Sequence, residues 1–161
     1  MKNLVFILVP FLLSCYAKNE TSTQARETNT VTEAEEKIAK DLIQGAFDHL
    51  WGGVDSTKIL DYHTEDFIIL EQGEVWDNDR IKQFMRKQLA KQDRPKRVNL
   101  MEYIAIEKYG PSMQIAYRNF GRFYKADSLV NKASWMESAV AIETPVGWRL
   151  KMMHSTWTGN K

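Results

Sequence analysis

The chain has 161 residues, with 22 Lys and Arg against 21 Asp and Glu, and its formal net charge is +1 at pH 7. This balance argues against a nucleic-acid-binding protein, because such domains carry a clear basic excess. A single cysteine excludes an internal disulfide. The length that remains after an amino-terminal signal is typical of one domain with one hydrophobic core.

The amino terminus has the features of an export signal. Lys2 precedes an apolar run from Leu4 to Leu13, which is too short to span a bilayer and suits a secretory signal. Leu12–Leu13–Ser14–Cys15 resembles the lipobox of bacterial lipoproteins, in which the cysteine is lipidated and the chain is cut before it. We therefore predict a signal peptide over residues 1–14 and export to a bacterial membrane, on its periplasmic or cell-surface face. The alternative is a plain secretory signal with Cys15 as an unmodified thiol.

The next segment, residues 15–31, starts at the predicted lipidated Cys15 and is almost free of apolar side chains. It cannot bury enough surface to offset the entropy cost of ordering, so we predict a flexible tether. The remaining residues, 32–161, are predicted to form the folded domain.

Three helices are predicted first. Thr32 to Glu35 forms a capping box, and apolar pairs recur at every fourth residue from Ile38 to Trp51, up to a stop at Gly52–Gly53. Asp55 is expected to cap a short helix that buries Ile59, Leu60 and Tyr62. After a strand over 67–70 and a turn into Val75–Trp76, Asp77 is expected to cap a third helix with an apolar stripe at Ile81, Phe84, Met85 and Leu89.

Long strands follow, over 97–108 and 113–124, and then a hairpin of 135–142 and 148–155 around a turn at Thr144–Gly147. Helices followed by antiparallel strands predict an α+β domain. Side chains of a strand alternate between its two faces, so Glu137 should share a face with Trp135, and His154 one with Trp148, Leu150 and Met152. An acid and an imidazole among bulky apolar groups favour a pocket rather than a plain wall.

The pattern of these elements resembles the nuclear transport factor 2-like superfamily, specifically its SnoaL-like and ketosteroid-isomerase-like domains. The resemblance is carried by Asp55 to Phe67, the Gly73–Trp76 turn, Ile81 to Met85, and Gly147 to Ser155. It implies a cone in which the three amino-terminal helices pack on a curved antiparallel sheet, with a pocket at the open end and often a homodimer. The superfamily holds enzymes and binding proteins, so the fold does not fix the chemistry.

Ketosteroid isomerases place a base on the first strand, a tyrosine on the first helix and an acid on a late strand. By this resemblance the base position falls on Glu71, the tyrosine position near Phe47, which has no hydroxyl, and the late position near Ala139, one pleat from Glu137. Steroid isomerisation is therefore not expected.

The catalytic candidates are Glu71, Glu137 and His154, and each has a structural alternative. Glu71 could be a solvated acid at a strand end, Glu137 could pair with Arg118, and His154 could be a hydrogen-bonded core imidazole. If the protein is an enzyme, we expect proton transfer with Glu71 or His154 as the base and Glu137 as the acid or the orienting group.

We expect a small, largely apolar ligand, bound by residues that are apolar or aromatic: Trp76, Tyr117, Trp135, Trp148 and Met152. The three histidines are scattered and lack metal-ligand spacing, so neither a metal nor a cofactor is expected. The competing interpretation is a homodimeric interaction module that uses the outer face of the sheet, with a vestigial pocket plugged by Trp135, Met152 and Phe123.

Basic residues gather on the predicted third helix and at its exit. We interpret them as a solvated face, the alternative being contact with anionic lipid: Lys82, Arg86, Lys87, Lys91, Arg94, Lys96 and Arg97.

Overall fold

A computed structural model describes residues 30–159. The predicted signal peptide, Cys15 and nearly all of the predicted tether lie outside this range. The elements are α1 (Glu33–Ala46) with a π-helical extension η1 (Phe47–Gly52), a 3₁₀ turn η2 (Ser56–Lys58), α2 (Ile59–Tyr62), β1 (His63–Glu71), β2 (Glu74–Asp77), α3 (Asn78–Leu89), β3 (Lys96–Tyr109), β4 (Ser112–Lys125), β5 (Ser128–Thr144) and β6 (Gly147–Gly159). None of the helices in the described range is long and apolar enough to cross a membrane.

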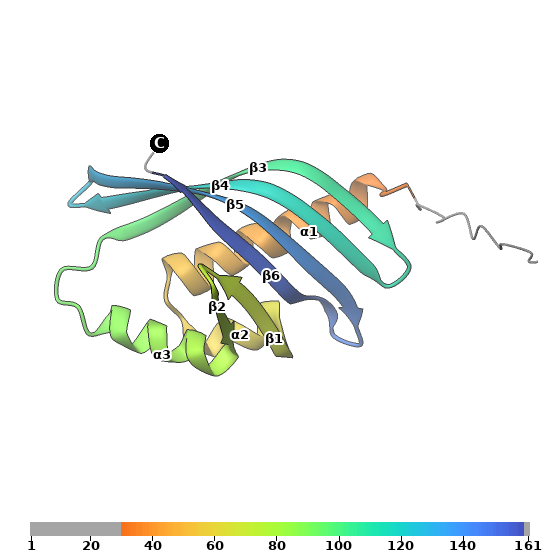
Figure 1. Ribbon diagram of the computed structural model, residues 1–161, viewed down its shortest axis with the longest axis horizontal. Coiled ribbons are helices and arrows are strands. Elements are labelled where there is room, and N and C mark those ends of the chain that lie inside the picture. Colours follow the sequence, from red (N-terminus) through yellow and green to blue (C-terminus); the bar gives the residue numbers. More distant parts are fainter. Residues whose placement is uncertain (1–29, 160–161) are drawn as a thin grey trace, which may run out of the picture.

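The six strands form one curved sheet in the order β2-β1-β6-β5-β4-β3. Figure 1 shows α1 running along the inside of the long strands β3 to β6, with α2 and α3 grouped beside β1 and β2. The α+β fold class is confirmed. The sheet departs from a purely antiparallel one at a single pair, because β1 runs parallel to β6.

Helix α1 forms as its sequence predicts. The Glu35 backbone N–H donates to Thr32 Oγ1 at 3.3 Å, and the Glu35 carboxylate accepts from the Thr32 N–H at 3.0 Å, which closes the capping box. The buried side of the helix consists of Ala39, Leu42, Ile43 and Ala46. Burial of this apolar stripe against the sheet is the main stabilisation of the helix.

Two leucines predicted to be buried are not. Leu60 is 55% exposed and Leu89 is 59% exposed. Helix α2 has a single turn, in which neighbouring residues point in different directions, so Ile59 faces the core and Leu60 faces solvent. Leu89 is the last residue of α3, beyond the part of the helix that packs on the core through Ile81 and Met85.

A β-bulge in β6 changes which side chains face the inside of the sheet. Val140 of β5 pairs with Met152 and Ala141 pairs with Leu150, so Lys151 is an extra residue. As a result Met153 and Ser155 are buried on the inner face, whereas Met152 and His154 are exposed on the outer face. The prediction that His154 and Met152 share a face with Trp148 and Leu150 is therefore wrong.

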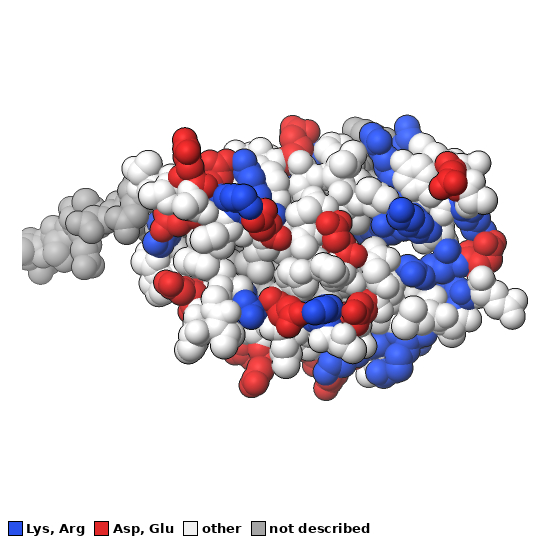
Figure 2. Space-filling model, turned by 180° about the vertical axis from the view of Figure 1, so that it is seen from behind, with Lys and Arg blue, Asp and Glu red and all other residues white. Residues whose placement is uncertain are grey.

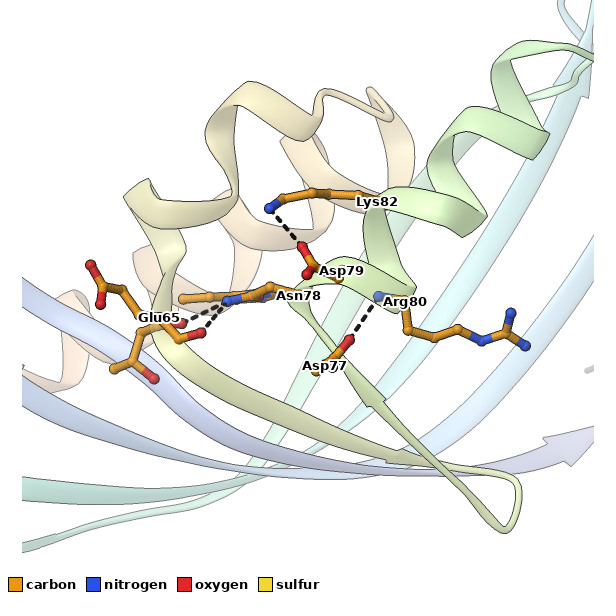
Figure 3. A network of polar contacts seen from close by, with 8 residues as sticks. Glu65, Asp77, Asn78, Asp79, Arg80 and Lys82 are labelled. Atoms are coloured by element: carbon orange, nitrogen blue, oxygen red, sulfur yellow. Dashed lines mark hydrogen bonds and ion pairs between the residues drawn. The ribbon is translucent and has the colours of Figure 1, made fainter.

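The start of α3 is tied to β1 by Asn78 (Figure 3). Its side-chain amide donates to the carbonyl oxygens of Thr64 at 2.8 Å and Glu65 at 3.1 Å, so its Oδ1 is left to accept from His63 Nδ1 at 3.0 Å. His63 is buried against the Phe67 ring, and this burial lowers its pKa from 6.5 to about 4. These bonds fix where α3 lies relative to the sheet.

Positive charge is segregated on the surface. Lysines and arginines gather at one end of the molecule, on the right in Figure 2, whereas acids and bases alternate elsewhere on that face. This end comprises the exit of α3 and the β4–β5 turn (left in Figure 1). Arg86, Lys87, Lys91 and Lys96 are exposed as predicted. Arg94 is half-buried and donates to the Gly52 carbonyl oxygen at 3.0 Å, and the Arg97 side chain turns inward to line a pocket.

Candidate functional site

A pocket of about 570 Å³ opens between the inner face of the sheet and the segments η1, β2 and α3. This volume is within the range of small-molecule sites. Its lining combines five aromatic and five charged side chains with three others: Phe47, Trp51, Ile69, Glu71, Gln72, Glu74, Trp76, Arg80, Phe84, Arg97, Trp135, Glu137 and Ser155.

Four rings form one continuous wall. The ring centroids of Phe47 and Trp51 are 6.3 Å apart, those of Trp51 and Phe84 are 5.8 Å apart, and those of Phe84 and Trp76 are 5.5 Å apart. The π-helical extension supplies the first two rings, α3 the third and β2 the fourth. Helix α3, which Asn78 ties to β1, therefore positions the Phe84 ring within this wall.

Glu137 of β5 is a buried acid in the lining of the pocket, with 5% of its surface exposed. Its carboxylate accepts from Ser155 Oγ at 2.9 Å and from Asn119 Nδ2 at 3.1 Å. Asn119 Oδ1 in turn accepts from Asn99 Nδ2 at 2.5 Å. The two amides thus form a chain of hydrogen bonds in which Asn99 donates to Asn119 and Asn119 donates to Glu137.

The ionised form of Glu137 is nevertheless disfavoured. Burial raises its pKa from 4.5 to about 7, while the bonds from Ser155 and Asn119 and the charge of Arg97 oppose this rise. The fully buried Tyr117 lies beside Glu137 on β4, and burial together with that acid raises the pKa of its phenol well above 10. Among the described residues its hydroxyl makes no hydrogen bond of standard geometry. Glu137 can therefore exchange a proton near neutral pH.

Arg97 of β3 is the cation nearest to this acid in the pocket. Its Nε donates to Asn99 Oδ1 at 2.9 Å. The guanidinium lies over three rings, with centroid distances of 4.8 Å to Trp135 and 5.7 Å to both Phe47 and Phe123. Burial lowers the pKa of Arg97 to about 10, and the charges of Glu137 and Glu71 act in the opposite direction.

The rim of the pocket carries a separate polar group. Glu74 accepts from Trp76 Nε1 at 2.7 Å and from Arg80 at 3.4 Å, and the Arg80 guanidinium lies 5.1 Å from the Trp76 ring. In Figure 3 the Arg80 side chain extends away from the bonds that anchor α3. These contacts fix the Trp76 ring at the mouth.

The structure brings four of the predicted site residues together: Glu71, Trp76, Trp135 and Glu137 all line the pocket. Tyr117 is buried behind Glu137 rather than in the lining. Three predictions do not fit the geometry: Trp148 packs against the core outside the lining, and Met152 and His154 lie on the outer face.

Two of the structural alternatives are also settled by geometry. The proposed partner of Glu137, Arg118, pairs instead with Glu102 at 2.7 Å, because both project from the outer face. His154 is exposed and is not a core imidazole. The predicted plug of Trp135, Met152 and Phe123 does not form, because Met152 lies on the outer face of the sheet.

Sequence reasoning missed Arg97, Asn99, Asn119 and Ser155. A signal existed in β4, where the inward positions Met113, Ile115 and Tyr117 are followed by Asn119, a polar residue on an apolar face. Ser155 could not be found by alternation, because the bulge at Lys151 reverses it.

The arrangement can support proton transfer or polar recognition of a ligand. Within residues 30–159 no group of three or more His, Cys, Asp or Glu side chains could hold a metal ion. Glu71 could accept a proton and Glu137 could donate one, and both line the same pocket.

No family model matches the chain, and no curated protein matches it. Solved structures do. The hub homology domain of CaMKII from Chlamydomonas reinhardtii has a TM-score of 0.66 at 15% identity, over 76% of this chain and 98% of that one. An NTF2-like protein from Cytophaga hutchinsonii has a TM-score of 0.62 at 9% identity, over 77% and 98%. A ketosteroid isomerase-like protein from Erwinia carotovora has a TM-score of 0.58 at 11% identity, over 80% and 99%.

The chain has the nuclear transport factor 2-like fold. At these identities the likeness shows the fold alone. The predicted resemblance is confirmed at that level, and the fold suits a ligand-binding or an association domain.

Proposed function

We propose that the nuclear transport factor 2-like domain binds a small, largely apolar molecule in the pocket that ends at Glu137. The observation that carries this proposal is an aromatic wall facing a buried, hydrogen-bonded acid inside a space of about 570 Å³. A domain that only needed a core would fill this space with side chains, because protein interiors are close-packed. A few polar groups within an apolar cavity are typical of small-ligand sites.

Native mass spectrometry tests this proposal. The protein is purified from its own host and sprayed under gentle conditions, and we expect a mass increment that disappears on denaturation. A Glu137→Gln, Trp135→Ala double variant should lose the increment, whereas a Glu143→Gln variant on the exposed part of the same strand should keep it. An increment equal in all three proteins would contradict the assignment of this pocket.

A second candidate is a homo-oligomeric association domain. It is favoured by the outer face of the sheet, where apolar side chains are exposed: Leu100, Met136 and Met152. The likeness to hub domains is consistent with association. Light scattering coupled to size exclusion would show a dimer that Met136→Asp converts to a monomer if this face is the interface. The two functions are compatible, because the pocket and this face lie on opposite sides of the sheet.

We also propose that the mature chain is a lipoprotein anchored at Cys15. The support is the sequence Leu12–Leu13–Ser14–Cys15, which lies outside the described residues. Intact mass of the membrane-extracted protein should show loss of residues 1–14 and a lipid adduct. An unmodified Cys15 thiol on a water-soluble product would contradict the anchor.

A further inference from the structure

Arg97 is a cation whose hydrogen-bonding capacity is largely unused. Its Nε is bonded to Asn99, and its plane is held over Trp135, Phe47 and Phe123. Rings attract the positive charge but accept no N–H bonds in the guanidinium plane. Throughout residues 30–159 the two Nη groups have no protein acceptor. The Arg97 side chain is thus held in place, while its two Nη groups remain able to donate hydrogen bonds to a ligand.

The acids that line the pocket do not accept hydrogen bonds from the two Nη groups of Arg97. Glu137 accepts from Ser155 and Asn119 and forms no direct ion pair with Arg97 in the described structure. Glu74 is engaged by Trp76 and Arg80 at the rim. The Glu71 carboxylate, at the end of β1, accepts from the side-chain amide of its neighbour Gln72. The cation is therefore partly removed from water without a partner that takes both Nη groups, which is costly unless a ligand supplies one.

A singly charged carboxylate suits the two Nη groups in this pocket better than a phosphate does. Its two oxygens accept two parallel N–H bonds from a guanidinium fork. A phosphate would bring close to two negative charges next to Glu71 and Glu137, both of which act on Arg97, and like charges at short range repel. Five aromatic side chains of the same lining offer an apolar surface to the rest of the ligand, which should therefore be apolar.

We propose that the pocket takes a small monocarboxylate with an aromatic or otherwise apolar body, and that Arg97 binds the carboxylate end-on through its Nη groups. This inference rests on the proposed function of the pocket as a small-molecule site. It names the chemical class of the ligand and the residue that selects it.

The test compares two probes of the same shape, 2-naphthoate and its neutral amide 2-naphthamide, by isothermal titration calorimetry with the purified full-length protein at pH 8. We expect the carboxylate to bind at least tenfold more tightly. Equal affinities, or tighter binding of the amide, would overturn the role of Arg97 while leaving the small-molecule pocket in place. Binding of neither probe would overturn the inference and count against the proposed function as well.

Variants test whether Arg97 causes the tighter binding of the carboxylate. Arg97→Gln should lower the affinity for 2-naphthoate to that of the amide and leave the amide affinity unchanged, and Arg97→Lys, which keeps the charge but loses the fork, should be intermediate. Arg122→Gln is the matched control. Arg122 lies on the outer face of β4, so this substitution removes the same charge at a site away from the pocket. If Arg97→Gln does not fold, the comparison of the two probes on the unchanged protein still tests whether the pocket prefers a carboxylate. Unchanged 2-naphthoate affinity in a folded Arg97→Gln protein would overturn the proposal.

Discussion

Replacement of Glu137 by glutamine should make the protein more stable in alkaline solution and not in acid. The side chain is 5% exposed, and burial raises its pKa from 4.5 to about 7. Between these pH values the folded protein holds a proton that the unfolded chain has released. The unfolding free energy therefore falls as pH rises through this window, and the full loss is reached above pH 7.

The magnitude follows from the same two numbers. At 1.36 kcal/mol for each pH unit, ionised Glu137 costs the folded state about 3 kcal/mol above pH 7. Glutamine carries no charge but presents one oxygen where the carboxylate presented two, so one of the bonds from Ser155 and Asn119 is lost, at about 1 kcal/mol. The variant should thus be about as stable as the parent or slightly weaker at pH 5, and about 2 kcal/mol more stable at pH 8.

Urea denaturation followed by tryptophan fluorescence at pH 5, 6, 7 and 8 measures this difference directly. Other titrating groups, including His63, are present in both proteins and cancel in the comparison. Parallel stability profiles for Glu137→Gln and the parent protein would refute the reasoning that burial dominates the titration of Glu137.

Three further changes test other parts of the fold. Leu42→Asp places an unpaired charge in the packed side of α1 and should abolish the cooperative thermal transition seen by circular dichroism. His63→Phe should gain about 2 kcal/mol relative to the parent on going from pH 8 to pH 5, because the parent loses stability as pH falls from 6.5 to about 4, and an unchanged difference in urea melts would contradict this. Gly121→Ala would bring a Cβ to 2.9 Å from the Trp135 ring, so the ring must move, and 2-naphthoate affinity should drop several-fold in calorimetry.

The order of elements could be predicted from the sequence because each boundary carries its own local signal. The Thr32 capping box, the Asp77 cap and the turn at Thr144–Gly147 all appear where those signals stand. The exposure of Leu60 and Leu89 could not be predicted in the same way. An apolar side chain marks a preference for burial, but the length of the helix and the reach of the core decide whether that preference is met.

The candidate site was predictable in part. Glu137 and Trp135 lie on one face because β5 alternates regularly between them, and Glu71 was located through the resemblance rather than through a pattern. His154 was misplaced because Leu150, Met152 and Met153 are all apolar, so the sequence fits either alternation equally well. Arg97 was assigned to a solvated face because it follows exposed lysines, whereas its inward position depends on rings from three distant segments.

The bulge at Lys151 allows the curvature of the sheet to change while the side chains that line the pocket stay the same. Because Lys151 is an additional residue, its deletion would leave each pair between β5 and β6 in place, and Ser155 would still lie opposite Glu137. What would change is the local bend of the strand. In a lineage of such domains, single-residue insertions and deletions at this point would alter how tightly the sheet closes around a ligand while the polar groups that meet it are inherited unchanged. Affinity for differently shaped molecules could thus diverge without a single substitution inside the pocket.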